Sequence, residues 1–120
     1  MSFASRIAPH VDRELAKAAE QRALNQPARE FTFLERAHVL GQGSTVQHVR
    51  THCLMLAWSV RNRSLKEFTG QLFRIAGAAT KTAFGLVPAG NTGGADVSPF
   101  KPLPVPDDLQ RILRAARHDA

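Results

Sequence analysis

The spacing of apolar residues along the chain predicts helices and no strands. Apolar side chains recur at three- and four-residue intervals, as they do along one face of an α-helix. Proline, glycine and asparagine separate the periodic segments, at 25–27, 41–43 and 62–64. The helices are therefore expected at about 9–25, 27–40, 45–61, 65–84 and 107–117. We expect an all-α fold of four main helices in antiparallel hairpins, bundle-like or similar in length to tetratricopeptide hairpins, with a C-terminal helix added.

The same pattern predicts which helix faces are buried. In the third helix the main apolar stripe consists of Val46, Val49, Cys53, Leu56 and Val60. The fourth helix is apolar over much of its circumference, which predicts a central, mostly buried element. Ser64 and Glu67 have the spacing of a capping box, in which each side chain accepts a free backbone N–H at the start of a helix.

The segment from Gly85 to Pro106 has a different character. It contains four of the eight glycines and five of the seven prolines of the chain. Proline removes backbone donors and glycine weakens regular elements, so this segment is expected to be irregular. Its apolar residues favour an ordered strap packed across the helices. We therefore expect one helical domain over 1–120, with a flexible N-terminus at 1–8, the strap at 85–106 and the C-terminal helix at 107–118.

Composition narrows the class of protein. Hydrophobic residues make up 43% of the chain and charged residues 22%, which is typical of a globular domain. The single cysteine, Cys53, excludes an internal disulfide and suits a reducing cytoplasm. No run of about 18 apolar residues is present, so no transmembrane segment is expected. Between Arg36 and Gly94 the chain has seven basic residues and one acid, which favours an acidic protein or a nucleic acid as partner, or else forms a solvated face.

One group of residues has the chemistry of a metal site. Glu35 and His38 are three apart on the second helix, and His48 and His52 are four apart on the third, so each pair shares a helix face. The turn between the helices is centred near Gly43, which places His38 level with His48 and Glu35 level with His52. Imidazole and carboxylate groups bind zinc, iron and copper. We therefore predict a metal site at Glu35, His38, His48 and His52, with the glutamate as a ligand or as a partner of one.

Other interpretations of these residues remain open. His38 lies near the C-terminus of its helix, where a cation is favourable, so it could instead cap that helix. His48 could lie exposed near the start of the third helix, and His52 could be a hydrogen-bonded core residue. The His48-x-x-x-His52 spacing matches a zinc peptidase helix, but Val49 stands where that chemistry needs a glutamate. Glu-x-x-His occurs in bundle-type di-metal sites in two copies, so the single copy here would require a dimer or a mononuclear site.

Three stretches carry a resemblance to a known family: LERAHVLGQ, HVRTH and VPAGNTGGADVSPFKPLPVPDDL. The chain resembles, over about 15–113, short bacterial proteins grouped as Domain of Unknown Function 3703. This resemblance implies a bacterial cytoplasmic protein and carries no activity or site residues. The favoured function is a small binding protein with the metal site described above. The alternatives are a helical adaptor for an acidic protein or nucleic acid, and a metal-dependent enzyme with a cleft under the strap.

Overall fold

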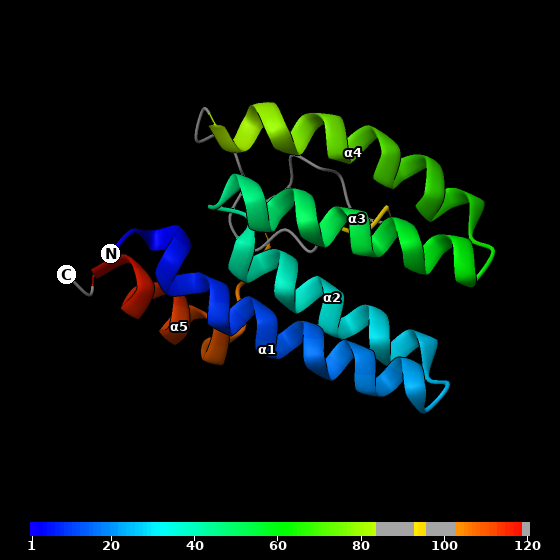
Figure 1. Ribbon diagram of the computed structural model, residues 1–120, viewed down its shortest axis with the longest axis horizontal. Coiled ribbons are helices and arrows are strands. Elements are labelled where there is room, and N and C mark those ends of the chain that lie inside the picture. Colours follow the sequence, from blue (N-terminus) through cyan, green and yellow to red (C-terminus); the bar gives the residue numbers. More distant parts are fainter. Residues whose placement is uncertain (84–92, 96–102, 119–120) are drawn as a thin grey trace.

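Helices make up most of the chain that the structure covers. The computed structural model describes residues 1–83, 93–95 and 103–118, and no strand occurs in these ranges. The helices are α1 (Phe3–Ala23), α2 (Pro27–Gly41), α3 (Thr45–Arg61), α4 (Leu65–Ala83) and α5 (Asp107–His118) (Figure 1). The all-α prediction is confirmed, and the breaks between helices lie where proline, glycine and asparagine indicated them.

The first helix begins earlier than the sequence pattern indicated. Ser2 is its N-cap, with the hydroxyl oxygen accepting the Ser5 N–H at 3.2 Å, so residues from Phe3 onward are helical. Pro9 therefore lies inside α1 and not in its first turn. Asn25, just after the C-cap Leu24, turns the chain with a φ of 56°, a left-handed conformation that asparagine tolerates better than most residues. Pro27 then starts α2 at a position where its missing N–H is not needed.

The helices form two antiparallel hairpins that lie side by side. α1 packs along α2, α3 packs along α4, and α2 joins the hairpins by packing against α3 (Figure 1). Gly41 permits this close approach, because a Cβ there would lie 2.8 Å from the Cβ of Gln47. α5 packs against α1 and α2. The interface between α2 and α3 is where the three predicted histidines meet.

The apolar core occupies the first hairpin and its contact with α5. One buried cluster joins α1, α2 and α5 through Ile7, Val11, Ala37, Val39, Leu40, Leu109, Leu113 and Ala116. A smaller cluster of Ala18, Leu34 and Met55 joins α1 and α2 to α3. Arg36 ties the same three helices together at the surface, because it pairs with Glu14 of α1 and Asp108 of α5. These two carboxylates raise the pKa of the guanidinium.

The predicted burial of α3 and α4 was wrong. In α3, Val46 is 72% exposed, Val60 is 60% exposed and Cys53 is exposed. The buried face is instead largely polar: Gln47, His48, Thr51, His52, Met55 and Ser59. α4 is an edge helix, since α3 is the only described helix that it packs against, and Phe73 on its outer side is 65% exposed. The face of α3 that is buried is largely polar, so much of its apolar stripe lies at the surface.

Most of the expected strap lies outside the described residues. The described parts are Gly93–Ala95 and Leu103–Pro106. Val105 packs on the larger core cluster. Ala95 lies against Gly70 of α4, where an added Cβ would come within 2.7 Å of the Ala95 Cβ. Gly70 therefore allows this segment of irregular chain to approach α4 closely. None of the described helices is both long enough and apolar enough to cross a membrane.

Candidate metal centre

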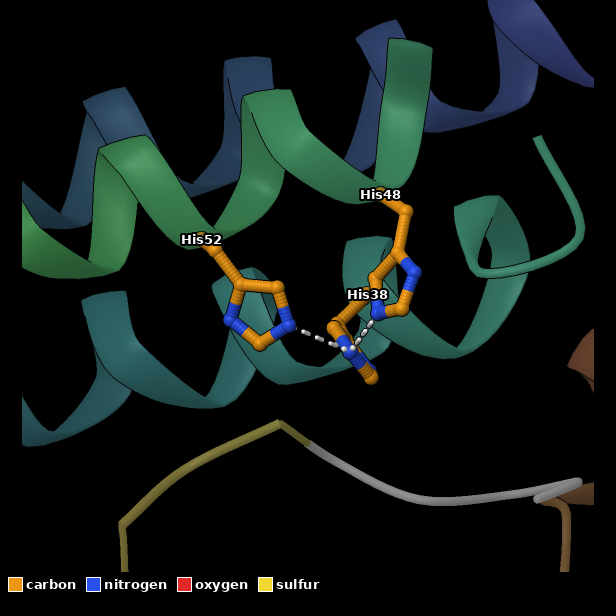
Figure 2. Close-up of side chains that lie close together, drawn as sticks. All are labelled: His38, His48 and His52. Carbon is orange, nitrogen blue, oxygen red and sulfur yellow. Dashed lines mark hydrogen bonds between the residues drawn. The ribbon is translucent and has the colours of Figure 1, made fainter. Parts of the chain in front are cut away.

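Three histidine side chains converge between α2 and α3. His38 comes from α2, His48 and His52 come from α3, and their rings point toward one another (Figure 2). The Nε2 atom of His38 lies 3.0 Å from Nε2 of His48 and 3.1 Å from Nε2 of His52. The side chains are buried, with 2%, 7% and 2% of their surface exposed. Imidazole nitrogens bound to one tetrahedral zinc ion at about 2.0–2.1 Å lie roughly 3.3 Å apart, so the two contacts of His38 have nearly the spacing of ligands.

A hydrogen bond to α4 determines which nitrogen of His52 faces this cluster. Nδ1 of His52 lies 2.6 Å from Oε1 of Gln71. The orientation of the Gln71 amide follows from its other partners. Its Nε2 donates to Glu67 Oε2 at 3.0 Å and to the Gly93 carbonyl oxygen at 2.8 Å. Carboxylate and carbonyl oxygens can only accept hydrogen bonds, so the nitrogen of the amide must face them. Oε1 therefore accepts from His52, so Nδ1 carries the proton. Nε2 of His52 is left with its lone pair directed at His38.

The hydrogen-bond chain continues beyond Gln71 to the irregular segment. The carboxylate of Glu67 accepts from Gln71 through Oε2 and from the Ala95 N–H, at 2.8 Å, through Oε1. Both Gln71 and Glu67 are buried. Metal-bound histidines commonly donate their second ring N–H to such an outer partner, which fixes the tautomer and the direction of the ring. The arrangement of His52, Gln71 and Glu67 matches this pattern.

The protons available within the cluster cannot satisfy all three nitrogens. If Nε2 of His38 carries a proton, it can direct that proton at only one of its two neighbours. If it carries a lone pair, it faces the lone pair of His52. In both neutral arrangements at least one close nitrogen contact has no proton along it. A cation placed between the three Nε2 atoms removes the repulsion, because each lone pair then has an acceptor.

The environment of His52 favours its neutral form, which is the form that binds a metal. Burial lowers the pKa of His52 from its ordinary 6.5 to about 4. The hydrogen bond to Gln71 acts in the opposite direction, and the positive charge of Arg74 lowers the pKa further. His52 is therefore neutral, and so able to act as a metal ligand, across the physiological pH range.

Gly93 closes one side of the cluster. Its φ is +83°, and a Cβ built on it would lie 2.5 Å from Cδ2 of His38 and 2.8 Å from its Nε2. Glycine is thus required here both by the backbone conformation and by contact with the imidazole ring. The carbonyl of the same residue accepts from Gln71, so Gly93 contacts one ligand candidate directly and a second through Gln71.

The structure brings together three of the four predicted site residues. The ligand nitrogens of His38, His48 and His52 all lie within 4.8 Å of one another, and no carboxylate or thiol of the described chain joins this group. Glu35 instead lines a cavity of about 500 Å³ between α2 and the approach to α5, next to Arg36. Cys53, which directly follows His52 on α3, is exposed and outside this group. The alternative of a surface His48 is wrong, because His48 is buried. His38 does lie in the last turn of α2, and His52 is a buried, hydrogen-bonded residue, as the alternatives for these two had it.

Gln71 and Glu67 are the site residues that the sequence analysis missed. The only signal in the chain was the capping box, of which one half is present: Ser64 Oγ accepts the Glu67 N–H at 3.3 Å. The Glu67 carboxylate is used elsewhere, because it binds Gln71 and Ala95. Amide and carboxylate partners of a ligand have no fixed spacing from it in sequence, so only the packing of α4 on α3 reveals them.

Fold and site together define a small all-α protein with a buried three-histidine cluster between two helical hairpins. The chain belongs to the family described as Protein of unknown function (DUF3703), whose model matches residues 5–113. The resemblance seen in the sequence is confirmed at this level. No curated protein and no solved structure matched the chain.

Proposed function

We propose that this protein binds one transition metal ion through the Nε2 atoms of His38, His48 and His52. The observation that carries the proposal is the approach of His38 Nε2 to both other Nε2 atoms, at 3.0 and 3.1 Å, in a buried site. Hydrogen bonds between imidazoles account for one of these contacts but not both, whereas a shared metal ion accounts for both. The outer hydrogen bond from His52 to Gln71 supports the same conclusion.

The donor set indicates which metals suit the site. Imidazole nitrogen is the ligand type preferred by zinc, copper(II) and nickel, whereas soft metals such as copper(I) favour thiolate. Cys53 is exposed and its thiol does not belong to the group of ligand atoms found among the described residues, so an ion that needs thiolate ligands fits this group poorly. Zinc is the best match of the three metals considered from the sequence, because three histidines with one further position is a well-established zinc arrangement. Copper(II) is the next best match, and iron sites more often include a carboxylate.

Elemental analysis of the full chain, purified without a polyhistidine tag, tests this proposal. We expect close to one equivalent of metal per chain after reconstitution with zinc and removal of the excess. The His48→Ala/His52→Ala double variant should lose it while keeping its helical circular dichroism. His118→Ala is the matched control, because this histidine is exposed at the end of α5 and outside the cluster. Equal metal content in the double variant, or none in the reconstituted wild type with zinc, copper or iron, contradicts the proposal.

A further inference from the structure

A groove of about 230 Å³ is lined by residues of α1, α2 and α3 alone. The helices α1 and α3 lie on either side of α2, which forms the floor of the groove (Figure 1). The apolar part of its lining consists of Leu15, Ala18, Ala19, Leu34 and Leu54. Ala18 and Leu34 are buried members of the smaller core cluster, so the floor is the outer surface of that core. The groove therefore offers an apolar chain a preformed surface.

The charged part of the lining is mostly basic, with Arg22, Arg50 and Arg61 against Glu30. The Arg61 guanidinium donates to the buried carboxylate of Glu30, so these two charges offset each other. At the other end of α3, Arg50 pairs with Asp12 at 2.6 Å. Three guanidinium groups therefore stand against two carboxylates, even when Asp12 is counted with the groove. An excess of one positive charge matches a ligand with one negative charge better than a phosphate monoester, which carries nearly two.

Arg22 and Arg61 lie at the same end of the groove. Arg22 is in the last turn of α1, and Arg61 is the last residue of α3. A neighbouring cavity of about 160 Å³ shares both arginines and Glu30 with the groove, and the rest of its lining is Asn25, Gln26, Pro27 and Asn62. This end is therefore polar, whereas the middle of the groove is apolar. Guanidinium groups bind carboxylates through paired N–H donors, so the polar end suits a carboxylate head group.

We propose that this groove binds a carboxylate that carries a short apolar chain, with its head group between Arg22 and Arg61 and its chain directed toward Leu54. Leu54 lies seven residues before Arg61 on α3, which is about 10 Å along the helix. Octanoate has a chain of similar length, and the ion pair of Arg50 and Asp12 lies beyond its expected end. The groove shares no lining residue with the histidine cluster, so the inference does not depend on the proposed metal site.

The test titrates sodium octanoate into the isotope-labelled full chain and follows the backbone amides by NMR, with sodium butanoate as the short-chain control. We expect saturable shifts with octanoate at 15–22, 30–34 and 50–61. Butanoate should bind roughly tenfold more weakly, because fewer methylene groups are buried. Arg22→Gln should weaken octanoate binding by about fivefold, the effect of losing one exposed charged contact. Arg111→Gln, which changes an exposed arginine on α5, should leave it unchanged.

Each part of the inference has an outcome that overturns it. Shifts confined to other parts of the chain, or no saturable shift with octanoate, overturn the site. Equal affinities for octanoate and butanoate overturn the role of the apolar floor. Wild-type affinity in Arg22→Gln overturns the place of the head group. Leu54→Asn keeps the test decisive if the Arg22 variant loses its helical circular dichroism, because it should reduce the preference for octanoate over butanoate.

Discussion

His52 and Gln71 are joined by a hydrogen bond of 2.6 Å between Nδ1 and Oε1, from the middle of α3 to the middle of α4. The bond sets the direction of the His52 lone pair and makes an edge helix part of the candidate metal centre. It also explains why a glutamine that is fully buried is tolerated on α4. All hydrogen-bonding groups of its amide head are engaged by His52, Glu67 or Gly93.

Replacing Gln71 should weaken metal binding without removing a ligand. In Gln71→Leu the His52 ring loses the acceptor that fixes its tautomer, and loss of such a partner typically lowers affinity by about 10–100-fold. The zinc affinity of the full chain, measured by competition with a chromophoric chelator, checks this. Gln110→Leu on the exposed face of α5 is the control and should bind as wild type does. Wild-type affinity in a well-folded Gln71→Leu would show that the hydrogen bond does not orient a ligand.

Gly93→Ala should reduce both stability and metal affinity. The residue has a φ of +83°, and the new methyl group would meet the His38 ring at 2.5 Å. A left-handed alanine costs about 1–2 kcal/mol, and displacement of the ring adds to that. We expect the urea midpoint to fall accordingly and zinc affinity to fall with it. Gly43→Ala provides the comparison, because Gly43 is exposed and an added Cβ there meets only the edge of the Phe3 ring, at 3.0 Å. Equal effects of the two substitutions would contradict a specific role for Gly93.

The metal-free protein should lose stability as pH falls below 7. The pKa of His52 is about 4 in the folded state, against an ordinary 6.5. Between these values the unfolded chain binds a proton that the folded chain does not, so the free energy of unfolding decreases as pH is lowered. The expected loss from pH 7 to pH 5 is about 2 kcal/mol. Urea unfolding at the two pH values measures it, and His52→Gln should lose most of this dependence. An unchanged acid sensitivity in that variant would assign the effect to other groups.

Cys53 should react with thiol reagents at the same rate whether or not metal is bound. Its side chain is exposed, it points about 100° away from His52 around the axis of α3, and its thiol is absent from the group of candidate ligand atoms. Reaction with a disulfide reagent, followed by absorbance before and after zinc reconstitution, is the measurement. Cys53→Ser should keep full zinc affinity. Protection of the thiol by zinc would place sulfur in the coordination sphere and change the proposed choice of metal.

The sequence predicted the convergence of the histidines because a short glycine turn between two helices fixes their relative level. His38 and His48 are equally distant from Gly43, so the hairpin geometry alone brings them together. The four-residue spacing of His48 and His52 then adds the third ring. Glu35 was placed by the same rule, but it lies beside the cavity next to Arg36. Three residues along a helix still differ by about 60° in direction, and that difference separates Glu35 from His38.

The burial of α3 could not be predicted from its apolar pattern. Its apolar residues follow a helical stripe, yet Val46 and Val60 are exposed, and His48, Thr51 and His52 are buried. A polar residue is buried when hydrogen-bond partners are available, and those partners belong to α2 and α4. Gln71 supplies one for His52 across 19 residues of sequence. Hydrophobic periodicity contains no information on such a pairing, so the register of α3 and the edge position of α4 follow only from the structure.

The most direct test of the metal centre is a crystal structure of the zinc-reconstituted full chain with diffraction data collected on both sides of the zinc absorption edge. The anomalous difference map locates the metal without assumptions about its ligands. We predict one strong peak between α2 and α3, about 2.0–2.1 Å from Nε2 of His38, His48 and His52. A map with no peak there, or with zinc bound only at surface residues, would contradict the central claim and make the three histidines a structural cluster.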